Sequence, residues 1–520
     1  MTTTPVSQGR QIATAALFIA VGNITSRLIG VVREAVFAAV YGRGVELAAF
    51  TAAATIPTLV YDLLLSGAMS AALVPVLSRV AHQPAQRDRL VSQVLSLLVV
   101  VATGLVLPIF WLAPQVVAWV AGGFDEPAQA LTTTMVRWMV FAVPCMVVAG
   151  VMTAVLQAQQ RFVLPAFVTS VFNIGLIVGA VVLTPWLGPV ALAGGMLLGA
   201  LAQVGLQWYG LRGVALRWNH EWRDPALREM LRLYAPVAVG MGFSALGTMI
   251  DRRLGSEYGA QVLPTMRYAT TLIQFPLGLV AAAVSTAILP TLARLTDSSA
   301  IEQFRTTVAQ ALTVVVALIV PAAVVLWLVR VPLTALILQR NAFVAADTQA
   351  VADTLLWYIP GLPAAAIDQI LLFACYARGR TLAPNLIQGA AIGGYVVGVL
   401  VGLPFFGQSA QTLAFANSVQ WITHMLLMVV LAHRLFDLRR LGLPLVAAQC
   451  AMAGAVCAVV VRAAATAAGS SSWPVVVQLI VLSGVAVVGY AVLAWLFRIT
   501  PVLAAYRLVY DKVRARLVRR

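Results

Sequence analysis

The chain has 520 residues, of which 61% are hydrophobic and only 10% charged, and its formal net charge is +16. A soluble protein of this size is excluded, because apolar stretches of about 20 residues recur along the whole length. We predict an all-α polytopic membrane protein. The basic residues lie mostly between the apolar stretches, so their charge indicates membrane orientation, and we expect no nucleic-acid partner.

The apolar stretches predict about fourteen transmembrane helices. They lie near residues 12–40, 47–77, 91–117, 130–158, 163–186, 189–210, 230–254, 262–290, 307–330, 348–376, 382–403, 408–433, 444–467 and 473–497. The first stretch follows a basic residue and resembles a signal peptide in that respect. It lacks a short apolar core with a small-residue cleavage site, so we expect it to be retained as the first span.

Neither the cysteines nor the histidines show the spacing of metal ligands. The four cysteines fall inside apolar stretches, and the four histidines are scattered. The sequence contains no hydrolytic constellation and no phosphate-binding loop for ATP. We therefore expect a protein that is not an enzyme and has no cofactor or metal site, with transport driven by an ion gradient or by the membrane potential.

The arginines between the predicted helices indicate the side of each loop. When the loops are numbered alternately, most arginines fall on one side, including those of the 212–232 loop and the 498–520 tail. Arginine-rich loops stay in the cytoplasm, so we place both termini there. The tail 506–520 spaces its basic residues among Leu and Val. That pattern favours an amphipathic helix on anionic lipid over a partner-binding segment.

Three pairs of similar segments predict an internal repeat. The segment "SAALVPVLSRV" (70–80) recurs as "STAILPTLARL" (285–295), which aligns Pro75 with Pro290. The other two pairs align Gly30, Glu34, Tyr41 and Gly42 with Gly247, Asp251, Tyr258 and Gly259, and Arg161, Pro165, Gly175 and Gly179 with Arg380, Pro384, Gly394 and Gly398. All three pairs occur in the same order with nearly the same separation.

From these repeats we predict two six-helix lobes, 1–224 and 225–440, followed by two further helices and a basic tail, 441–520. Each lobe has an even number of spans, so both have the same orientation in the membrane. Transporters of this plan rock one bundle against the other around a site at the bilayer midplane. A channel is less natural, because nothing in the sequence resembles a selectivity filter.

The first predicted helix carries charges at a depth where lipid is expected. It would be about 43 Å long, against an apolar core of about 30 Å, so it must tilt, protrude or break, and Ser26 and Gly30 are its weak points. Arg27 and Arg33 would face different directions in an unbroken helix, whereas a break at Gly30 would turn both inward. Arg33 could instead snorkel or pair with a carboxylate. Arginine in a cavity suits phosphate, because its planar fork binds oxygens in pairs.

Further charged residues lie inside other predicted helices: Asp62, Asp251, Arg252, Arg253, Arg267 and Asp368. Asp251 and Arg252 could neutralise each other. Arg253 and Arg267 could snorkel at the outer ends of their helices. Asp62, Asp251 and Asp368 are the candidates for ion coupling or for pairing inside a cavity.

Five segments together resemble the MurJ (MviN) lipid II flippase family, a branch of the multidrug/oligosaccharidyl-lipid/polysaccharide exporter superfamily. They are "SRLIGVVREAVFAAVYGRG" (26–44), "IPTLVYDLLLSGAMSAALVPVLSR" (56–79), "IDRRLGSEYG" (250–259), "LIQFPLGLVAAAVSTAILPTLAR" (272–294) and "LILQRNAFVAADT" (336–348) with its continuation. The resemblance runs from about residue 14 to about 400. It implies movement of the lipid-linked peptidoglycan precursor, lipid II, from the inner to the outer leaflet of the bacterial cytoplasmic membrane.

The resemblance also implies a cationic central cavity. Ser26, Arg27 and Arg33 match the family's first-helix motif, and Pro75 and Pro276 match its second and eighth helices. Together with Gly30 and Pro290, these two prolines are the candidate hinge or structural positions. The chain departs from the family where further arginines are usual, because it has Tyr61 in the second helix and Thr271 in the eighth. Arg253 or Arg267 would then have to compensate.

The sequence leaves three functions open. The first is a lipid II flippase in which cavity arginines hold the pyrophosphate, with Ser26, Tyr61, Thr271, Arg253 and Arg267 as further candidate contacts. The second is an exporter of another polyprenyl-linked glycan or of an amphipathic compound. The third is a membrane scaffold that recruits cell-wall synthesis enzymes without transport. The expected partners are lipid II or a similar glycolipid, membrane lipids and, for the scaffold, those enzymes.

Overall fold

The computed structural model describes residues 5–66, 73–80, 82–211, 213–295, 301–380, 382–437 and 443–499. Within these ranges the side chains of 5–20, 66, 75, 236, 279, 281–294, 443 and 444 are not described. Every regular element in the described residues is a helix. The chain divides into two compact units, residues 1–264 with 340–343 and residues 265–339 with 344–520.

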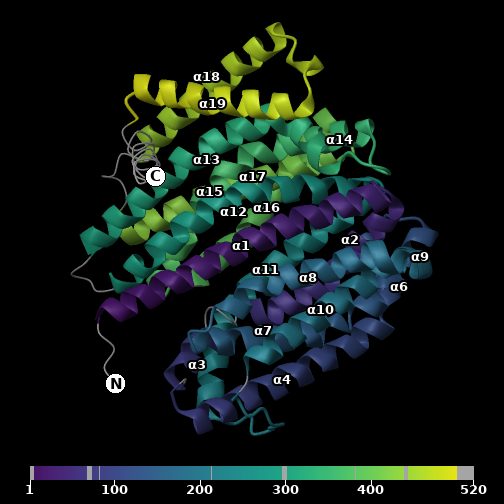
Figure 1. Ribbon diagram of the computed structural model, residues 1–520, viewed down its shortest axis with the longest axis vertical. Helices are drawn as coiled ribbons and strands as arrows, with labels where there is room; N and C mark the ends of the chain where they lie inside the picture. The colour runs from purple at the N-terminus through teal and green to yellow at the C-terminus, as the bar shows by residue number, and fades with distance from the viewer. Residues whose placement is uncertain are drawn as a thin grey trace, which may run out of the picture. The chain divides into compact units, whose positions relative to one another are not determined.

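Unit 1 contains the helices up to α11. Their bounds are α1 Pro5–Tyr41, α2 Val45–Tyr61, η1 Asp62–Ser66, α3 Val74–Val80, α4 Pro84–Trp111, α5 Ala113–Ala121, α6 Glu126–Met139, α7 Ala142–Ala158, α8 Val163–Val178, η3 Gly179–Leu183, α9 Thr184–Leu187, η4 Gly188–Val190, α10 Ala191–Gly210 and α11 Pro225–Glu257. Figure 1 shows α4, α7, α8 and α10 running alongside one another in this unit.

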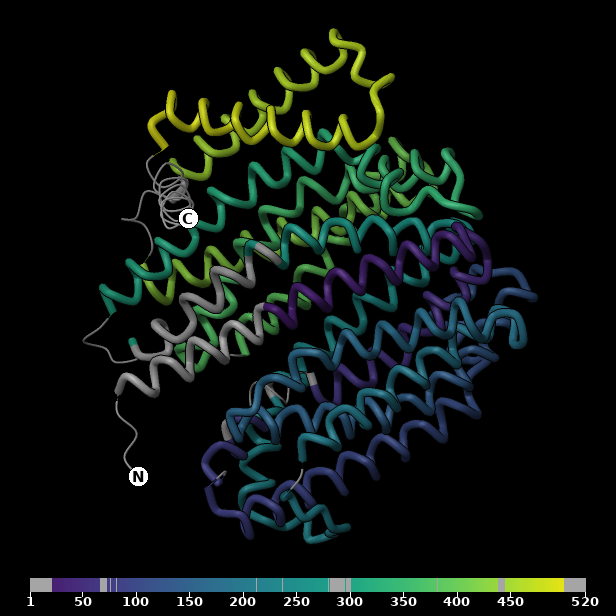
Figure 2. Tube along the Cα trace, viewed as in Figure 1, coloured from purple at the N-terminus to yellow at the C-terminus, as the bar shows by residue number. Residues whose placement is uncertain are grey.

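Unit 2 contains the remaining helices, apart from the first turn of α12, which belongs to unit 1. Their bounds are α12 Val262–Arg294, α13 Ile301–Leu338, α14 Ala345–Tyr358, η6 Ile359–Gly361, α15 Leu362–Ala377, α16 Leu382–Phe406, α17 Ala410–Phe436, α18 Leu443–Ala467, η8 Ser470–Ser472 and α19 Val475–Leu496. In Figure 2, α18 and α19 form a hairpin at the yellow end of the chain. Both helices pack against α13.

Glycines bring neighbouring helices together in both units. A Cβ at Gly175 of α8 or at Gly179 of η3 would overlap the backbone of α10, at Gly199 or Gly195 respectively. In unit 2 a Cβ at Gly398 of α16 would overlap Ala416 of α17. Small residues at helix contacts are typical of membrane proteins, where close backbone approach replaces the hydrophobic driving force.

The segment that joins α10 to α11 is held along α4. The backbone N–H groups of Ala215, Arg217 and Asn219 donate to the side chains of Asp88, Ser92 and Ser96, each over 3.0 Å. Two residues of extended chain advance about 6.6 Å and four residues of helix about 6 Å, so alternate residues of the segment match every fourth residue of α4. Side chains of α4 thus bind the backbone of an extended segment, as a neighbouring strand would in a sheet.

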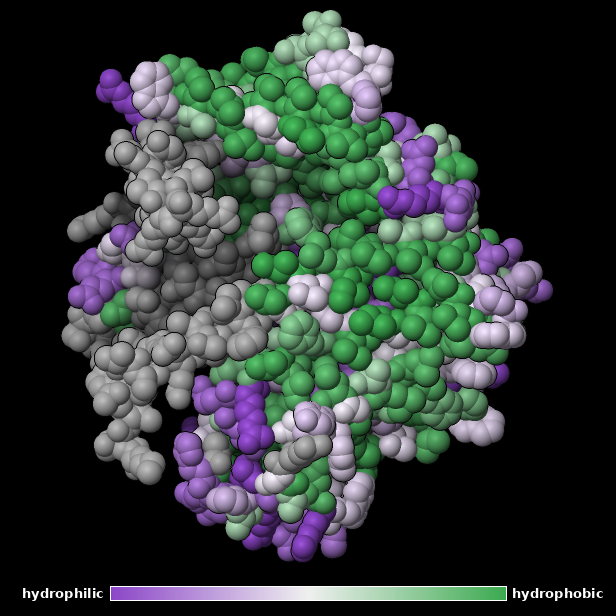
Figure 3. Space-filling view, in the orientation of Figure 1, coloured by the Kyte–Doolittle hydropathy of each residue, from purple (hydrophilic) through white to green (hydrophobic). Residues whose placement is uncertain are grey.

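The described residues contain nine helices long and apolar enough to cross a membrane, or up to eleven if each of two bent pairs is one span. Figure 3 shows apolar side chains over much of the visible face, with hydrophilic ones gathered around α3. The helices and their exposed apolar surfaces, which include Leu400, Phe405 and Ile480 at 64%, 76% and 68% exposure, are those of a multi-pass membrane protein.

Candidate functional site

Arg33 lies in a polar cluster between α1 and α8. It donates from Nε to Glu34 Oε1 over 2.9 Å and from Nη1 to Asn173 Oδ1 over 2.7 Å, and its Nη2 pairs with the same Glu34 oxygen. The side chain of Glu34 is 1% exposed and that of Arg33 20%. Asn173 donates from Nδ2 to the carbonyl of Ser26 over 3.4 Å. Of the two readings left open for Arg33, this structure has the carboxylate pair.

Of the three alternatives for an over-long first helix, a break at Gly30 is not the one that occurs in this structure, because α1 runs unbroken from Pro5 to Tyr41. Arg27, which is half-buried, therefore differs from Arg33 by about 240° around the helix axis. A Cβ at Gly30 would stand 3.7 Å from Asn173, an ordinary contact, whereas one at Gly22 would overlap Ala166 of α8. The close approach of α1 to α8 thus requires glycine at 22, and the packing at 30 would accept a side chain.

Tyr61 and Asp62 mark a change in helix geometry. Tyr61 is the last residue of α2, and Asp62 begins the π-helical turn η1. Tyr61 packs against the apolar core of α3, α4 and α7, and a Cβ at Gly150 of α7 would lie 3.4 Å from its hydroxyl. Where the resemblance leads us to expect an arginine, this chain therefore places an aromatic ring against a core. Such π-turns inside helices are frequent at functional sites.

Arg253 connects the end of α11 to α5. It donates from Nε to Glu257 over 2.9 Å and from Nη1 to the carbonyl of Ala118 over 2.7 Å, and its side chain is 39% exposed. Just beyond the helix, burial raises the pKa of Tyr258, and the charge of Glu257 adds to the rise. Asp251 and Arg252, expected to neutralise each other, do form an ion pair at 3.7 Å.

Arg267, Thr271 and Pro276 lie on α12 in unit 2. The hydroxyl of Thr271 donates to the carbonyl of Arg267 over 3.0 Å, and the hydroxyl of Thr270 donates to it over 2.9 Å. Thr271 thus has its hydroxyl proton committed to its own helix. Pro75 and Pro290 lie on α3 and α12, but their side chains are outside the description, as are repeat residues 67–72 and the basic tail 506–520.

Asp368 on α15 meets a partner that the sequence did not single out. Its Oδ1 lies 2.7 Å from Nδ1 of His424 on α17, and the two side chains are 20% and 9% exposed. The four histidines are scattered in the sequence, and only the packing of α15 on α17 brings this one to the carboxylate. Asn173 was missed for the same reason, because a lone amide in an apolar stretch carries no signal of its partner.

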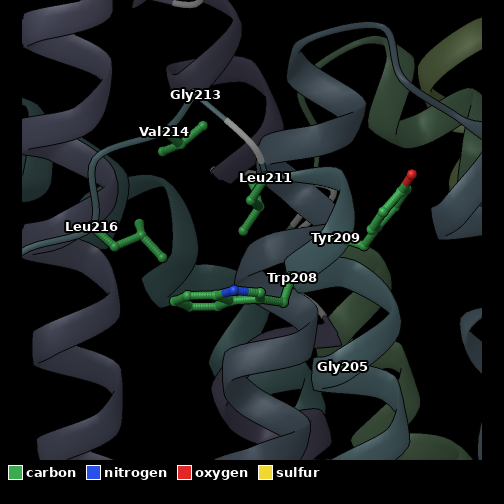
Figure 4. Close-up of a pocket in the computed structure, with 7 residues that line it drawn as sticks. All are labelled: Gly205, Trp208, Tyr209, Leu211, Gly213, Val214 and Leu216. Carbon is green, nitrogen blue, oxygen red and sulfur yellow. The ribbon is translucent and has the colours of Figure 1, made fainter.

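A cavity of about 610 Å³ lies in unit 1, where α10 ends and the segment held on α4 begins. Trp208 forms one wall in Figure 4, with Leu211, Val214 and Leu216 around it, and the ring of Tyr209 points away. Trp208 is 63% exposed. Among the described residues, no group of three or more His, Cys, Asp or Glu side chains could hold a metal ion.

Comparison with known proteins identifies the family. The model of the family described as "Lipid II flippase MurJ" matches residues 37–498. A probable lipid II flippase MurJ of Rhizobium meliloti (strain 1021) is 28% identical over 435 residues, 80% of each chain. The lipid II flippase MurJ of Burkholderia cenocepacia is 29% identical over 408 residues, 75% of this chain and 78% of that one.

Two solved structures have a fold similar to that of this chain. A lipid II flippase MurJ in an inward closed conformation superposes with a TM-score of 0.77 at 19% identity, covering 92% of this chain and 98% of the other. An inward-facing multidrug resistance MATE family transporter of the MOP superfamily gives a TM-score of 0.63 at 13% identity, over 80% and 96% of the chains. Structural likeness at these identities concerns the fold alone. The match over residues 37–498 shows that the chain belongs to the lipid II flippase MurJ family, as a multi-pass membrane transporter and not an enzyme.

Proposed function

We propose that the chain moves lipid II from the inner to the outer leaflet by alternating access, with Arg27 and Arg33 contacting the pyrophosphate. The observation that carries the proposal is the polar cluster on α1. A guanidinium at this depth is costly unless it is paired. Here Glu34 and Asn173 hold that of Arg33 in one place, with 20% of the side chain exposed. A guanidinium that is already held in one position can bind the oxygens of a phosphate.

Glu34 has a specific part in this mechanism. It neutralises Arg33 before cargo arrives, which lowers the cost of keeping the charge away from water. A pyrophosphate with two or more negative charges then competes with one carboxylate for the same donors. Binding replaces the Glu34 carboxylate with the pyrophosphate at Arg33. Because Glu34 can return to Arg33, the cargo can still leave on the other side of the membrane.

The alternating movement is assigned to two six-helix lobes, 1–224 and 225–440, with residues 441–520 adding two helices and the tail. Local geometry supports the repeat. Gln160 and Gly379 both have positive φ, 62° and 67°. The next residues, Arg161 and Arg380, both donate their backbone N–H to the carbonyl five residues earlier, over 2.8 and 2.9 Å. Aligned positions of the two halves therefore end their helices in the same way.

We assign fourteen spans to these helices, more than the nine to eleven that pass by length and composition in the described residues. The span Val163–Gly210 contains two of the predicted crossings, separated by the positive-φ residue Gly188. Helices α1 and α12 extend beyond the described side chains and supply two more. Arginine-rich loops then place both termini in the cytoplasm of a bacterium, with the protein in its cytoplasmic membrane and its tail against anionic lipid. Candidate ion-coupling positions are Asp62, Asp251 and Asp368, and candidate hinge positions are Gly30, Pro75, Pro276 and Pro290.

A second candidate function is export of another polyprenyl-linked glycan or an amphipathic compound. It is favoured by Tyr61, which packs against an apolar core, and by Thr271, which bonds its own helix. Neither supplies the positive charge usual at these positions in the family. Ser26, Arg253 and Arg267 complete the candidate contacts, although Arg253 is engaged by Glu257 and Ala118.

The test is complementation of a bacterial strain depleted of its own lipid II flippase. We expect the wild-type chain to restore growth and Arg27→Ala and Arg33→Ala to fail at equal membrane abundance. Arg305→Ala is the control, because Arg305 pairs with the 78% exposed Glu302 at the start of α13. Rescue by both arginine variants would remove these residues from the mechanism. A wild-type chain that does not rescue, but binds cell-wall enzymes, would support the scaffold.

A further inference from the structure

Asp368 and His424 form a polar pair between α15 and α17 of unit 2. Their Oδ1 and Nδ1 atoms are 2.7 Å apart, and the side chains are 20% and 9% exposed. Helix α17 runs from Ala410 to Phe436, so His424 lies about 18 to 21 Å from either end. For a helix that crosses an apolar layer of about 30 Å, this is the middle of the membrane.

Close packing fixes the position of the imidazole. Along α17, Ser418 donates to the carbonyl of Trp357 over 2.6 Å, and the ring of Trp421 lies 5.8 Å from that of Tyr358. His424 follows at the same spacing of three residues. A Cβ at Gly361 would overlap both Ser418 and Trp421. The face of α17 that carries His424 is thus held against α14 and η6, which precede the turn at Gly361, and against α15, which follows it.

A structural clamp alone does not need these residue types. Two neutral side chains would join the helices without the cost of keeping a carboxylate in an apolar surrounding. The pair has one property that a neutral pair lacks, because imidazole changes its charge between about pH 5 and pH 8. Ionisable groups inside transmembrane helices commonly mark proton or ion pathways.

Few other titratable groups lie near the pair. On α15 itself, Cys375 and Tyr376 interact electrostatically with Asp368, and the Tyr376 hydroxyl donates to Asn385 of α16. The titratable or charged residues on the described parts of the helices packed against α15 and α17 are Glu302, Arg305 and Arg330 on α13, Asp347, Asp353 and Tyr358 on α14, Tyr395 on α16, and His433 and Arg434 on α17.

Most of those residues are engaged away from the pair. Glu302 and Arg305 pair with each other, and Arg330 donates to the carbonyl of Trp327. Asp353 accepts from Gln349, and Asp347 from the backbone of Val344. Asp368 and His424 are therefore the main groups in this described part of unit 2 that can gain or lose a proton together.

We propose that Asp368 and His424 form a proton-binding site that couples proton movement to transport. With the imidazole neutral, Nδ1–H donates to the ionised carboxylate of Asp368. An incoming proton binds the lone pair of Nε2 and leaves from the same atom later in the cycle, and no other bond forms or breaks. Protonation changes the pair from a net negative charge to zero, which favours a conformation closed to water. The inference rests on the proposed transport function, to which it supplies a driving ion.

The first experiment measures the proton site without transport. The full chain in lipid nanodiscs carries ¹³C-labelled histidine, and the signal of His424 is assigned by its loss in His424→Gln. We expect the signal of this imidazole to report a change of protonation state between pH 5 and pH 8, and that change to differ in Asp368→Asn, because Asp368 Oδ1 is the partner of Nδ1. An imidazole that keeps one protonation state across this range would overturn the proposal.

The second experiment measures lipid II flipping in proteoliposomes at a series of pH values. We expect the wild-type rate to change by up to about tenfold per pH unit on the limb where protonation limits it. His424→Gln should lose that limb. His433→Gln should keep it, because His433 lies at the end of α17, 4.0 Å from Asp437. A His424→Gln profile equal to that of the wild type would overturn the coupling. If the wild type flips no lipid II at any pH, the transport proposal fails while the titration still decides the proton site.

Discussion

At the scale of single residues, the charges inside α1 are accommodated by partners that lie far away in sequence. Arg33 reaches Asn173 on α8, and Glu34, buried to 1% exposure, completes the pair. The sequence predicted a carboxylate as one possible partner of Arg33, whereas the period of an α-helix puts Glu34 on the face of Arg27, seven residues away. The long side chain of Arg33 bends to its neighbour instead, which helical spacing cannot indicate.

The first prediction concerns Glu34. Replacing it with Gln leaves the guanidinium of Arg33 mostly buried without a compensating charge, which should cost about 1–3 kcal/mol of stability. Thermal unfolding of the detergent-purified protein, followed by the fluorescence of a thiol-reactive dye at its buried cysteines, should show a lower midpoint. Glu302→Gln is the matched control, because the Glu302 carboxylate is 78% exposed and water screens its pair with Arg305. Equal midpoints for Glu34→Gln and the wild type would contradict a stabilising pair.

At the scale of elements, the connection between α10 and α11 is more ordered than its composition suggests. A polar, arginine-containing loop predicts a flexible cytoplasmic segment. Instead, three side chains of α4 accept from alternate backbone N–H groups, and Arg89 pairs with Glu221 over 2.8 Å further along. The spacing of Asp88, Ser92 and Ser96 carries this information, but only a structure shows which chain lies on that face.

The second prediction tests this attachment. Ser92→Ala with Ser96→Ala removes the acceptors of the Arg217 and Asn219 N–H groups, and both serines are 3% exposed. Each loss should cost about 1 kcal/mol locally. Limited trypsin digestion should therefore cut at Arg217 or Arg223 several times faster than in the wild type. Ser78→Ala is the control, since its hydroxyl donates only within α3. Unchanged cleavage would mean that the segment is held by other contacts.

At the scale of the whole molecule, composition and apolar length predicted the fold class, because the membrane permits few solutions for a chain this apolar. The described residues contain nine helices long and apolar enough to cross a membrane, or up to eleven if each bent pair is one span, against about fourteen predicted. The division into crossings was less predictable. The bent pair α6 and α7 and the turns η1 and η3 depend on how neighbouring helices pack.

The partners within the site were less predictable still. Asn173 and His424 carry no pattern of their own, because a single polar residue in an apolar helix is equally compatible with several neighbours. Proximity in the fold is what gives each of them a role. The unbroken α1 likewise reflects packing, since Gly22 seats the helix against Ala166 and no force bends it at Gly30.

The last prediction concerns orientation in the membrane. Arginine-rich loops stay in the cytoplasm, so residue 223 should face the cytoplasm and the turn at 469–473 the opposite side. Ser471 and Arg223 are both exposed, so only the bilayer limits access to a cysteine at either place. In intact spheroplasts a membrane-impermeant maleimide should label Ser471→Cys, and it should label Arg223→Cys only after permeabilisation. The wild-type background is low, since Cys375, Cys450 and Cys457 are buried and Cys145 is half-buried. Labelling of Arg223→Cys in sealed cells would show the opposite orientation. The cargo would then reach α1 from the other side of the membrane.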